Sequence, residues 1–442
     1  MRVSSWHRAP ALVIGAVVAL TLAACGTTNS ASTQKVTISF WYMPNGTTPK
    51  DYVNQEIAAF NAAHPNITVQ PTLVDWGQVG NKMNAVLAGG QGPDVTQVGT
   101  TLVGTYSKAF HSFTQSEING LGGKGAFTQA TWTDTGIYGS GKTTAVPWFI
   151  DTRAVYYRKD ILQKDGVDPA SAFQNWSSFE AALAKIKAAG DNALGMPSND
   201  WNVIHNMSPW IWEAGGDYLS SDGSKPVIAE DAAVNGVYQW QRIAGTYVDP
   251  AILQKNSADM DAYFAQGKFA ITISGPWLQQ QLQDPGPNGV DSPTSKAGFG
   301  TAAFPSGPDG KRFVFFGGSN LAILKASKHN DAAYEFVRWL TSDAGQKSYI
   351  HKIGMYPSRA GVGDKAPFSN DTYLTAFAQQ MKDGKSYPLV TAWGPIESTL
   401  SKDFGTLWQR VSQHGGPLTR SQVKGLLQTT AQDMSAAIQN AT

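Results

Sequence analysis

The sequence predicts an α/β protein built from two domains. Short apolar strands alternate with amphipathic helices in the first part of the chain, which is typical of a mostly parallel sheet covered on both faces. The 442 residues exceed the roughly 250–300 at which a single hydrophobic core stops growing. The content of 42% hydrophobic and 15% charged residues is that of a globular protein. Because no obvious linker divides the chain, we expect it to cross between the two domains more than once.

The first strands and helices can be placed from their periodicity. Alternating apolar residues predict a strand at 36–42, and turn formers then lead into a helix that ends at His64-Pro65. A second strand within 66–75, a helix around 79–87 and a third strand at 94–98 follow. Since ligands bind beyond the carboxyl ends of the strands in such sheets, we expect 42–47 and 99–101 at one rim.

Later elements have clear signals at a few places. The segment 146–160 is extended and apolar, and 268–277 and 314–325 are further strand candidates. Ser177 and Glu180 suggest a capping box at the start of a helix that ends before Gly190. A helix is expected at 331–340, and the chain is mainly helical from Tyr373 onward.

The N-terminus has the order of a bacterial export signal. Arg2 and Arg8 precede an apolar run that is too short to span a membrane, and small residues lead to Cys25, the one cysteine of the chain. Leu22-Ala23-Ala24-Cys25 resembles the lipobox of bacterial lipoproteins, in which the Cys is lipidated and becomes the mature N-terminus. The alternative is an ordinary secretory signal with a chance Cys. We expect a lipoprotein signal peptide at 1–24, and a flexible tether at 25–34 that holds the protein to the extracellular face of the cell membrane by the lipid on Cys25.

Composition excludes several classes of function. Removal of Arg2 and Arg8 leaves 32 basic residues against 33 acidic ones, so the clustered positive charge of a nucleic-acid-binding protein is not expected. A single Cys cannot form an intrachain disulfide. The 14 Trp residues indicate a binding surface, because buried Trp needs a partner for its N–H group and so many exceed the needs of a core.

Motifs for catalysis or cofactor binding are either missing or in the wrong context. Gly136 to Thr143 satisfies the phosphate-binding loop pattern, but no buried strand precedes it and Pro147 prevents a long helix after it. The sequence has no H-E-x-x-H, no G-x-S-x-G and no Cys/His cluster. We therefore expect no cofactor, no metal and no enzymatic activity. The alternative enzyme would be a secreted glycoside hydrolase with two carboxylates.

A set of short motifs in a fixed order carries a resemblance to a known family. After the lipobox-like segment come Phe40-Trp41, FNAAHP (60–65), GPDV (92–95), VPW (146–148), YRKD (157–160), ISGPW (273–277), Gly317-Gly318, AYEFVRWLTSD (333–343) and GMYPSR (354–359). The chain resembles, over nearly all of 36–440, the carbohydrate-type extracellular solute-binding proteins of ABC importers, the group that includes maltose-binding protein.

The resemblance implies a two-lobed periplasmic-binding-protein fold of type II, with the ligand in a cleft between lobes that are joined by hinge crossings. Crossings are expected near Ile150–Arg153, Phe269–Thr272 and Lys325–Lys328. Lobe one is then 35–150 plus 271–326, and lobe two is 152–269 plus 328–442.

Candidate sugar-binding residues follow from the resemblance and from sugar chemistry. Trp rings cover the apolar faces of a sugar, and planar polar groups pair with its hydroxyls. Relatives place a stacking aromatic at Trp277, an acidic contact at Asp151, and an aromatic and a polar contact on one helical face at Trp393 and Glu397. Further candidates are Trp201, Asn202 and His205 before a Gly-Gly pair, Thr100, Thr101 and Asn45 at the predicted rim, Gly317 and Gly318 for close backbone approach or a bulge, and Arg359 as a clamp or a structural ion pair. Trp148, Trp210 and Trp212 could be core or site, and we favour core for the last two.

The expected function is capture of a sugar, with an oligosaccharide favoured, and its delivery to ABC permease subunits in the membrane. We expect a monomer. The alternative ligand is a phosphoester such as glycerol phosphate, which would require converging Arg, Lys or helix N-termini.

Overall fold

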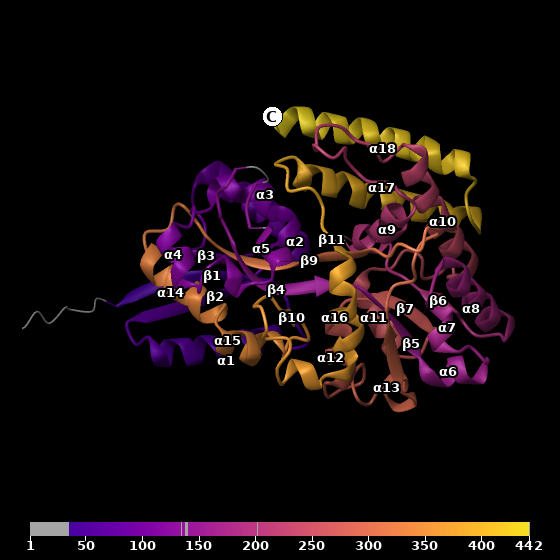
Figure 1. Ribbon diagram of the computed structural model, residues 1–442, viewed down its shortest axis with the longest axis horizontal. Coiled ribbons are helices and arrows are strands. Elements are labelled where there is room, and N and C mark those ends of the chain that lie inside the picture. The colour runs from indigo at the N-terminus through magenta and orange to yellow at the C-terminus, as the bar shows by residue number, and fades with distance from the viewer. Residues whose placement is uncertain (1–34, 134, 138–139, 201, 442) are drawn as a thin grey trace, which may run out of the picture. The chain divides into compact units, whose positions relative to one another are not determined.

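Two β-sheets organise the chain in the computed structural model, which describes residues 35–133, 135–137, 140–200 and 202–441 (Figure 1). The expected signal peptide, Cys25 and the tether lie outside these residues. The first sheet has the strand order β10-β4-β9-β3-β1-β2, with β11 paired to β9, and the second has the order β6-β7-β5-β8. The strands are β1 (Val36–Tyr42), β2 (Ile67–Leu73), β3 (Val95–Gly99), β4 (Val146–Thr152), β5 (Ala154–Arg158), β6 (Leu194–Gly195), β7 (Ile271–Ser274), β8 (Phe299–Ala302), β9 (Val314–Ile323), β10 (Tyr356–Pro357) and β11 (Gly384–Lys385).

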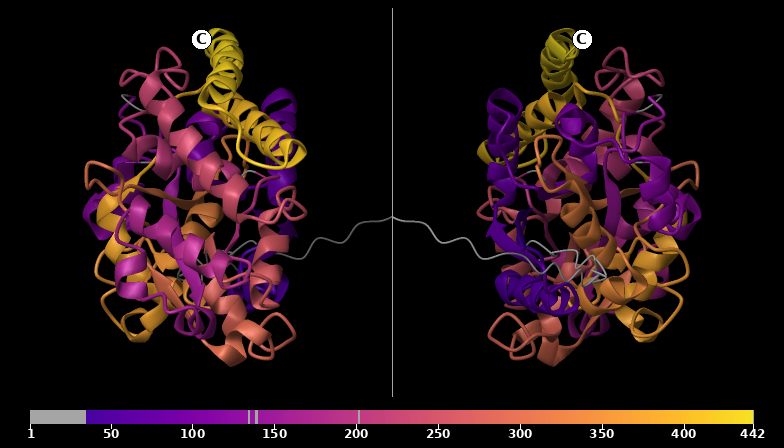
Figure 2. Two further views of the ribbon diagram at one scale, coloured as in Figure 1. Left: turned by 90° about the vertical axis from the view of Figure 1, so that its right-hand side faces the viewer. Right: turned by 90° about the vertical axis from the view of Figure 1, so that its left-hand side faces the viewer.

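The expected α/β architecture is confirmed, and helices surround both sheets. Figure 2 shows that α17 and α18 lie along one another at one side of the molecule. The helices are α1 (Pro49–Ala63), α2 (Trp76–Gly89), α3 (Val103–Tyr106), α4 (Gln115–Gly120), α5 (Gln129–Thr133), α6 (Lys159–Lys164), α7 (Pro169–Ala172), α8 (Trp176–Ala188), α9 (Asn202–Glu213), α10 (Asp231–Tyr247), α11 (Ser257–Ala265), α12 (Trp277–Gln283), α13 (Pro293–Ala297), α14 (Asn330–Leu340), α15 (Asp343–Gly345), α16 (Thr375–Gln380), α17 (Trp393–His414) and α18 (Arg420–Ala441).

The first sheet is mixed rather than mostly parallel. β1 runs parallel to β2 and β3, whereas β9 is antiparallel to both β3 and β4. β1, β3 and β4 therefore point the same way, and their carboxyl ends share one edge. The register pairs Gly99 with Ser319 and Asp151 with Gly317, which places the end of β4 beside the expected rim.

The chain passes from the first sheet to the second within two residues. β4 ends at Thr152 and β5 begins at Ala154, which is where the Ile150–Arg153 crossing is expected. The chain crosses back to the first sheet later than expected. β7 and β8 both belong to the second sheet, and β9 is the strand that rejoins the first. The segment 271–326, expected in lobe one, is thus divided between the sheets.

The helix after β9 also differs from the expected division. α14 packs against β1 and β9 of the first sheet, and its Phe336 and Val337 share a core with Phe40 of β1. The segment 328–442, expected wholly in lobe two, therefore begins beside the first sheet. α17 and α18 complete the second core, in which Trp210 and Trp212 are both buried.

Helix ends follow local chemistry, although one cap lies earlier than expected. The capping box of α8 is formed by Asn175 and Ser178, not by Ser177 and Glu180. Asn175 has the extended backbone of an N-cap and its side chain accepts from the N–H of Ser178, so the helix starts at Trp176. Pro395 lies in the first turn of α17, where backbone N–H groups have no acceptor within the helix, so the proline costs no hydrogen bond.

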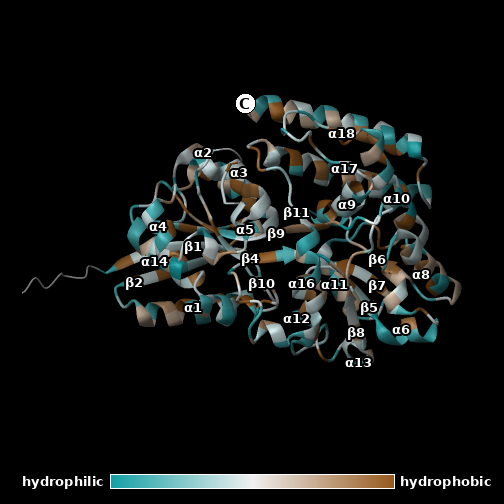
Figure 3. Ribbon diagram, in the orientation of Figure 1, coloured by the Kyte–Doolittle hydropathy of each residue, from teal (hydrophilic) through white to brown (hydrophobic). Residues whose placement is uncertain are grey.

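Figure 3 shows hydrophilic and hydrophobic residues alternating along the helices, and strand β4 largely hydrophobic up to its hydrophilic end. Within the described ranges, no helix combines the length and apolar character needed to cross a membrane. Residues 140–145, at the end of the phosphate-loop-like motif, are followed by strand β4 and not by a helix, so the described part of that motif lacks the helix N-terminus that cradles phosphate.

The backbone of β4 passes so close to residue 318 that only a glycine fits there, and a substitution can test this. Its φ is +141°, and a Cβ built there would lie 2.0 Å from the carbonyl oxygen of Phe149. We expect Gly318→Ala to lower the free energy of unfolding by more than about 2 kcal/mol, because strain and overpacking add.

Urea unfolding measures this effect, with Gly90→Ala as the control. Gly90 has a φ of +65° and open space around it, so the control loses only about 1–2 kcal/mol of backbone preference. Equal losses in the two variants would contradict the packing explanation.

Candidate functional site

The side chain of Arg153 lies at the crossing between the sheets, with no exposed surface. Its Nη1 donates to Asp151 Oδ1 at 2.5 Å and to the Thr152 carbonyl at 3.0 Å. Its Nε and Nη2 both donate to Asn202 Oδ1, at 3.0 and 2.6 Å. Burial raises the pKa of the Asp151 carboxyl, and the guanidinium opposes that shift. Asp151 and Asn202, two predicted site residues from different elements, are therefore joined by one cation.

Trp277 faces the same cation. Its ring centre is 4.9 Å from the Arg153 guanidinium carbon, and Phe315 of β9 lies 5.3 Å away, within the range of a cation–π contact. The indole Nε1 of Trp277 donates to Asp261 Oδ2 at 2.7 Å. The predicted stacking residue is thus half-buried at the amino end of α12, next to Asp151 and Asn202.

An aromatic row continues from Phe315 toward α17. His205 stacks on Phe315 with ring centres 3.7 Å apart, and its Nδ1 lies 2.7 Å from the Tyr387 hydroxyl. Tyr387 stacks in turn on Trp393 at 4.6 Å. Burial, helped by Arg153, holds the pKa of His205 well below its usual value, so the ring is neutral at pH 7. Trp393 has no exposed surface.

Thr101 and Glu397 connect the rim of the first sheet to α17. The Thr101 hydroxyl donates to both oxygens of Glu397, at 3.0 and 3.2 Å. Burial raises the pKa of Glu397 to about 7, and the Thr101 hydroxyl lowers it. The neighbouring Thr100 hydroxyl accepts from Asn320 Nδ2 of β9 at 3.1 Å.

Asn45 belongs to a buried network beneath this rim. Its Nδ2 donates to Gln97 Oε1 at 3.1 Å, and Gln97 Nε2 donates to Ser319 at 2.8 Å. Gly317 lies opposite Asp151 in the register of β9 and β4, and Trp201 lies outside the described residues.

Arg359 is not brought to this site. Its Nε donates to Asp343 at 2.6 Å and its Nη1 to the carbonyls of Leu121 and Thr341. Trp148 is buried against Tyr349, with ring centres 5.0 Å apart and parallel planes. Both residues are held by structural contacts. Of the two roles considered for Arg359, a ligand clamp or a structural ion pair, the structure shows the ion pair.

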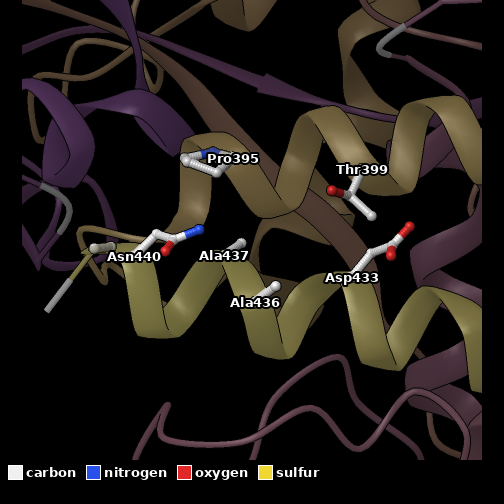
Figure 4. A pocket seen from close by; sticks show the side chains of 7 residues that line it. Pro395, Thr399, Asp433, Ala436, Ala437 and Asn440 are labelled. Atoms are coloured by element: carbon white, nitrogen blue, oxygen red, sulfur yellow. The ribbon is translucent and has the colours of Figure 1, made fainter.

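A pocket of about 540 Å³ lies apart from the predicted residues, between α17 and the end of α18 (Figure 4). Its lining is Pro395, Thr399, Asp433, Ala436, Ala437, Asn440 and Ala441. None of the predicted sugar-binding residues belongs to this lining. Pro395 and Thr399 are nevertheless on the same helix as Glu397, on a different face.

Four residues of the arrangement were missed in the sequence: Arg153, Phe315, Tyr387 and Asp261. Arg153 could have been found, because it lies two residues from Asp151 at the expected crossing. The others are joined only by tertiary contacts. Within the described residues, no group of three or more His, Cys, Asp and Glu side chains is placed to hold a metal ion. The arrangement offers aromatic faces, carboxylates and amides, which is the chemistry of a hydroxyl-rich ligand.

The raised pKa of Glu397 predicts a pH-dependent stability. The pKa of Glu397 is about 7 in the folded state, above the ordinary 4.5. The protonated form therefore contributes to the free energy of unfolding fully below pH 4.5, and this contribution is lost as the pH rises through 7. We expect Glu397→Gln to be more stable than the wild type at pH 8 by about 1–3 kcal/mol, and to differ little at pH 4.5.

Denaturant unfolding at the two pH values measures this difference. Glu230→Gln, at an exposed position, is the control and should show no such pH-dependent gain. A gain for Glu397→Gln that is the same at both pH values would contradict the burial of the charge.

Comparisons with known proteins identify the family of this chain. The family described as bacterial extracellular solute-binding protein matches residues 44–347. A relative in Streptomyces coelicolor, the diacetylchitobiose binding protein DasA, is 24% identical and the match covers 86% of this chain and 88% of that protein. The maltooligosaccharide ABC transporter solute-binding lipoprotein of Streptococcus pneumoniae is 23% identical over 62% of this chain and 64% of that protein.

Solved structures show the same fold. The maltose-bound MalE3 of T. maritima is similar with a TM-score of 0.79 and 20% identity, over 90% of this chain and 99% of that one. UgpB from Mycobacterium tuberculosis, in complex with glycerophosphocholine, has a TM-score of 0.74 and 19% identity, over 92% of this chain and 99% of that one. The two-lobed fold expected from the motifs is confirmed, and the chain belongs to the family of bacterial extracellular solute-binding proteins.

Proposed function

We propose that this protein captures a sugar, with an oligosaccharide as the favoured class, between two lobes and delivers it to the permease of an ABC importer. One observation carries the proposal: residues predicted to bind the ligand contact one another, or a shared neighbour, from the edge of the first sheet and from three helices. Asp151 and Thr101 come from the edge of the first sheet, and Asn202, Trp277 and Glu397 come from helices α9, α12 and α17. A ligand that touches both sides stabilises the closed arrangement.

The chemistry at the crossing supports a neutral ligand over a phosphoester. The guanidinium at this site already pairs with Asp151 and Asn202, so it does not offer a phosphate the unpaired cation that such a ligand needs. Aromatic rings and carboxylates suit sugar faces and hydroxyls. The relatives named for diacetylchitobiose and for maltooligosaccharides support a sugar, whereas the neighbour that holds glycerophosphocholine represents the alternative.

The proposal includes binding without catalysis and an anchor at Cys25. The family consists of solute-binding proteins, and the pneumococcal relative is named as a lipoprotein. The mature chain is a monomer at the outer face of the cell membrane, held there by lipid on Cys25, and it meets the permease subunits when closed. Lobe one holds the first sheet with α14, and lobe two holds the second sheet with α17 and α18.

The ligand class can be tested by thermal shift with the mature chain. We expect an oligosaccharide series to raise the melting temperature by mass action, since the ligand binds only the folded state, and chromatography to find the sugar unhydrolysed. Shifts with glycerol phosphoesters alone would overturn the neutral-sugar class, and release of shorter sugars would identify a glycoside hydrolase.

The contribution of Trp277 can be measured with a matched pair of variants. We expect Trp277→Ala to weaken oligosaccharide binding about 10- to 100-fold in calorimetric titrations, because the aromatic face is lost. Trp339→Ala is the control, since Trp339 is also half-buried and its indole also donates to a carboxylate, Glu56, at 2.7 Å. Equal affinities for the two variants would refute this site.

The anchor is tested by Cys25→Ser. We expect this variant to leave the membrane fraction, because the thiol that carries the lipid is absent while the rest of the signal is kept. Fractionation of cells followed by immunoblotting measures the distribution. Retention of the variant in the membrane fraction would rule out the lipid anchor.

A further inference from the structure

The indole of Trp277 is fixed by contacts on several sides. Nε1 donates to Asp261 at 2.7 Å, and the Arg153 guanidinium lies over the ring. On another side the ring lies against the backbone of Gly275, since a Cβ built at Gly275 would be 1.9 Å from the ring atom Cζ3. The glycine at 275 therefore admits the ring close to the backbone, and Asp261 accepts from the polar edge of the indole.

Asp261 is itself held in place. It lies on α11 with 5% of its surface exposed, and its second oxygen accepts from the Ser274 hydroxyl at 2.8 Å. Burial raises the pKa of Asp261 to about 6, although the hydrogen bonds from Trp277 and Ser274 lower it. Asp200 and Arg153 are the charged groups that act on this carboxyl, and the Tyr156 phenol is also close enough to be affected by it.

Asp261 is a buried carboxylate that contacts the predicted stacking residue, whose ring also faces the Arg153 guanidinium. A neutral acceptor would satisfy the indole N–H and the Ser274 hydroxyl without burying a charge. The charged form makes the stronger hydrogen bond to the indole, so it restricts the ring that has to meet the ligand.

We propose that Asp261 is a positioning residue for ligand binding, which orients Trp277 so that the indole is already set to stack on a sugar ring. This inference rests on the proposed function, and it names the residue that sets the orientation of the ring on which the sugar stacks. Asp261 acts through Trp277 and does not touch the ligand.

The molecule supplies a closely matched control. Glu56 on α1 accepts from the Trp339 indole at 2.7 Å and from the Ser348 hydroxyl at 2.8 Å, and it is buried with 7% of its surface exposed. This Trp–carboxylate–Ser arrangement repeats the one at Asp261 but lies in the core of the first sheet, apart from the site. A purely structural role would give the two carboxylates the same effect on binding.

The experiment compares Asp261→Asn with Glu56→Gln in the mature chain, with maltotriose and diacetylchitobiose as probes in calorimetric titrations. We expect Asp261→Asn to weaken binding of the probe that the wild type takes by about tenfold, the effect of losing a charged acceptor. Glu56→Gln should stay within twofold of the wild type. Ser274→Ala removes the other donor but keeps the indole contact, and should also stay within twofold.

The pH profile separates positioning from structure. Because the ionised carboxylate holds the indole, wild-type affinity should rise as the pH increases from 5 to 6.5 through the pKa of about 6, and Glu56→Gln should keep that rise. Asp261→Asn should lose this part of the profile, while any change near pH 7 that comes from Glu397 remains. Thermal unfolding at pH 7 checks that both variants are folded.

Each outcome decides the inference. If wild type binds a probe and Asp261→Asn binds it as tightly and with the same pH profile, the positioning role is overturned and the sugar-binding function stands. If Glu56→Gln weakens binding as much, the effect is one of general stability and the inference is again overturned. If the wild type binds neither probe nor any sugar of the thermal-shift panel, the proposed function and this inference both fail.

Discussion

The burial of the Arg153 guanidinium is the constraint on which the rest of the site depends. An unpaired charge in the interior is strongly destabilising, so every group around it must compensate. Asp151 on β4 supplies the countercharge, and the side-chain oxygen of Asn202 on α9 accepts two hydrogen bonds from Arg153. The rings of Trp277 and Phe315 lie against the guanidinium. One cation thereby connects groups from two strands of the first sheet and from two helices at the residue where the chain passes between the sheets.

This arrangement explains how the site and the hinge can be the same region. β4 and β9 are antiparallel and both extend to the crossing, where Thr152 pairs with Phe316. Two hydrogen bonds connect the rim of the first sheet to other parts of the chain in this structure: Thr101 donates to Glu397 of α17, and Thr47 donates to Asp284, the residue that follows α12. Under the proposed function, bending at the crossing would change both distances, and a ligand that touches both sides would shift the equilibrium toward closure.

The sequence was sufficient for elements whose pattern is local. The alternation at 36–42 predicted β1, and the resemblance to the family placed Asp151 at the crossing. The sheet to which β7 belongs could not be predicted, because Ile271 and Ile273 fit either sheet and the choice is made by pairing with β5. Phe315 and Tyr387 were missed for the same reason, since they meet His205 only through tertiary packing.

Two predicted contacts illustrate where residue type alone misleads. Arg359 has the chemistry of a clamp, yet its donors are used by Asp343 and by backbone carbonyls. Gly318 was expected to allow a ligand close to the backbone, and the backbone it admits is that of β4. At both positions one physical property, the hydrogen-bond donors of Arg359 or the missing side chain of Gly318, fits a ligand contact and a structural contact equally well. The residues that surround each position decide which contact is made.

The electrostatics of the candidate site bear on the charge of the proposed ligand. Burial raises the pKa of Glu397 to about 7 and that of Asp261 to about 6, so the site resists additional negative charge near neutral pH. An anionic ligand would raise these pKa values again and would lose binding free energy in doing so. A hydroxyl that donates to Glu397 has the opposite effect, because a hydrogen bond to the charged form lowers the pKa. Under the proposed function, binding of a neutral, hydroxyl-rich molecule next to Glu397 would favour the ionised carboxylate and release a proton from it.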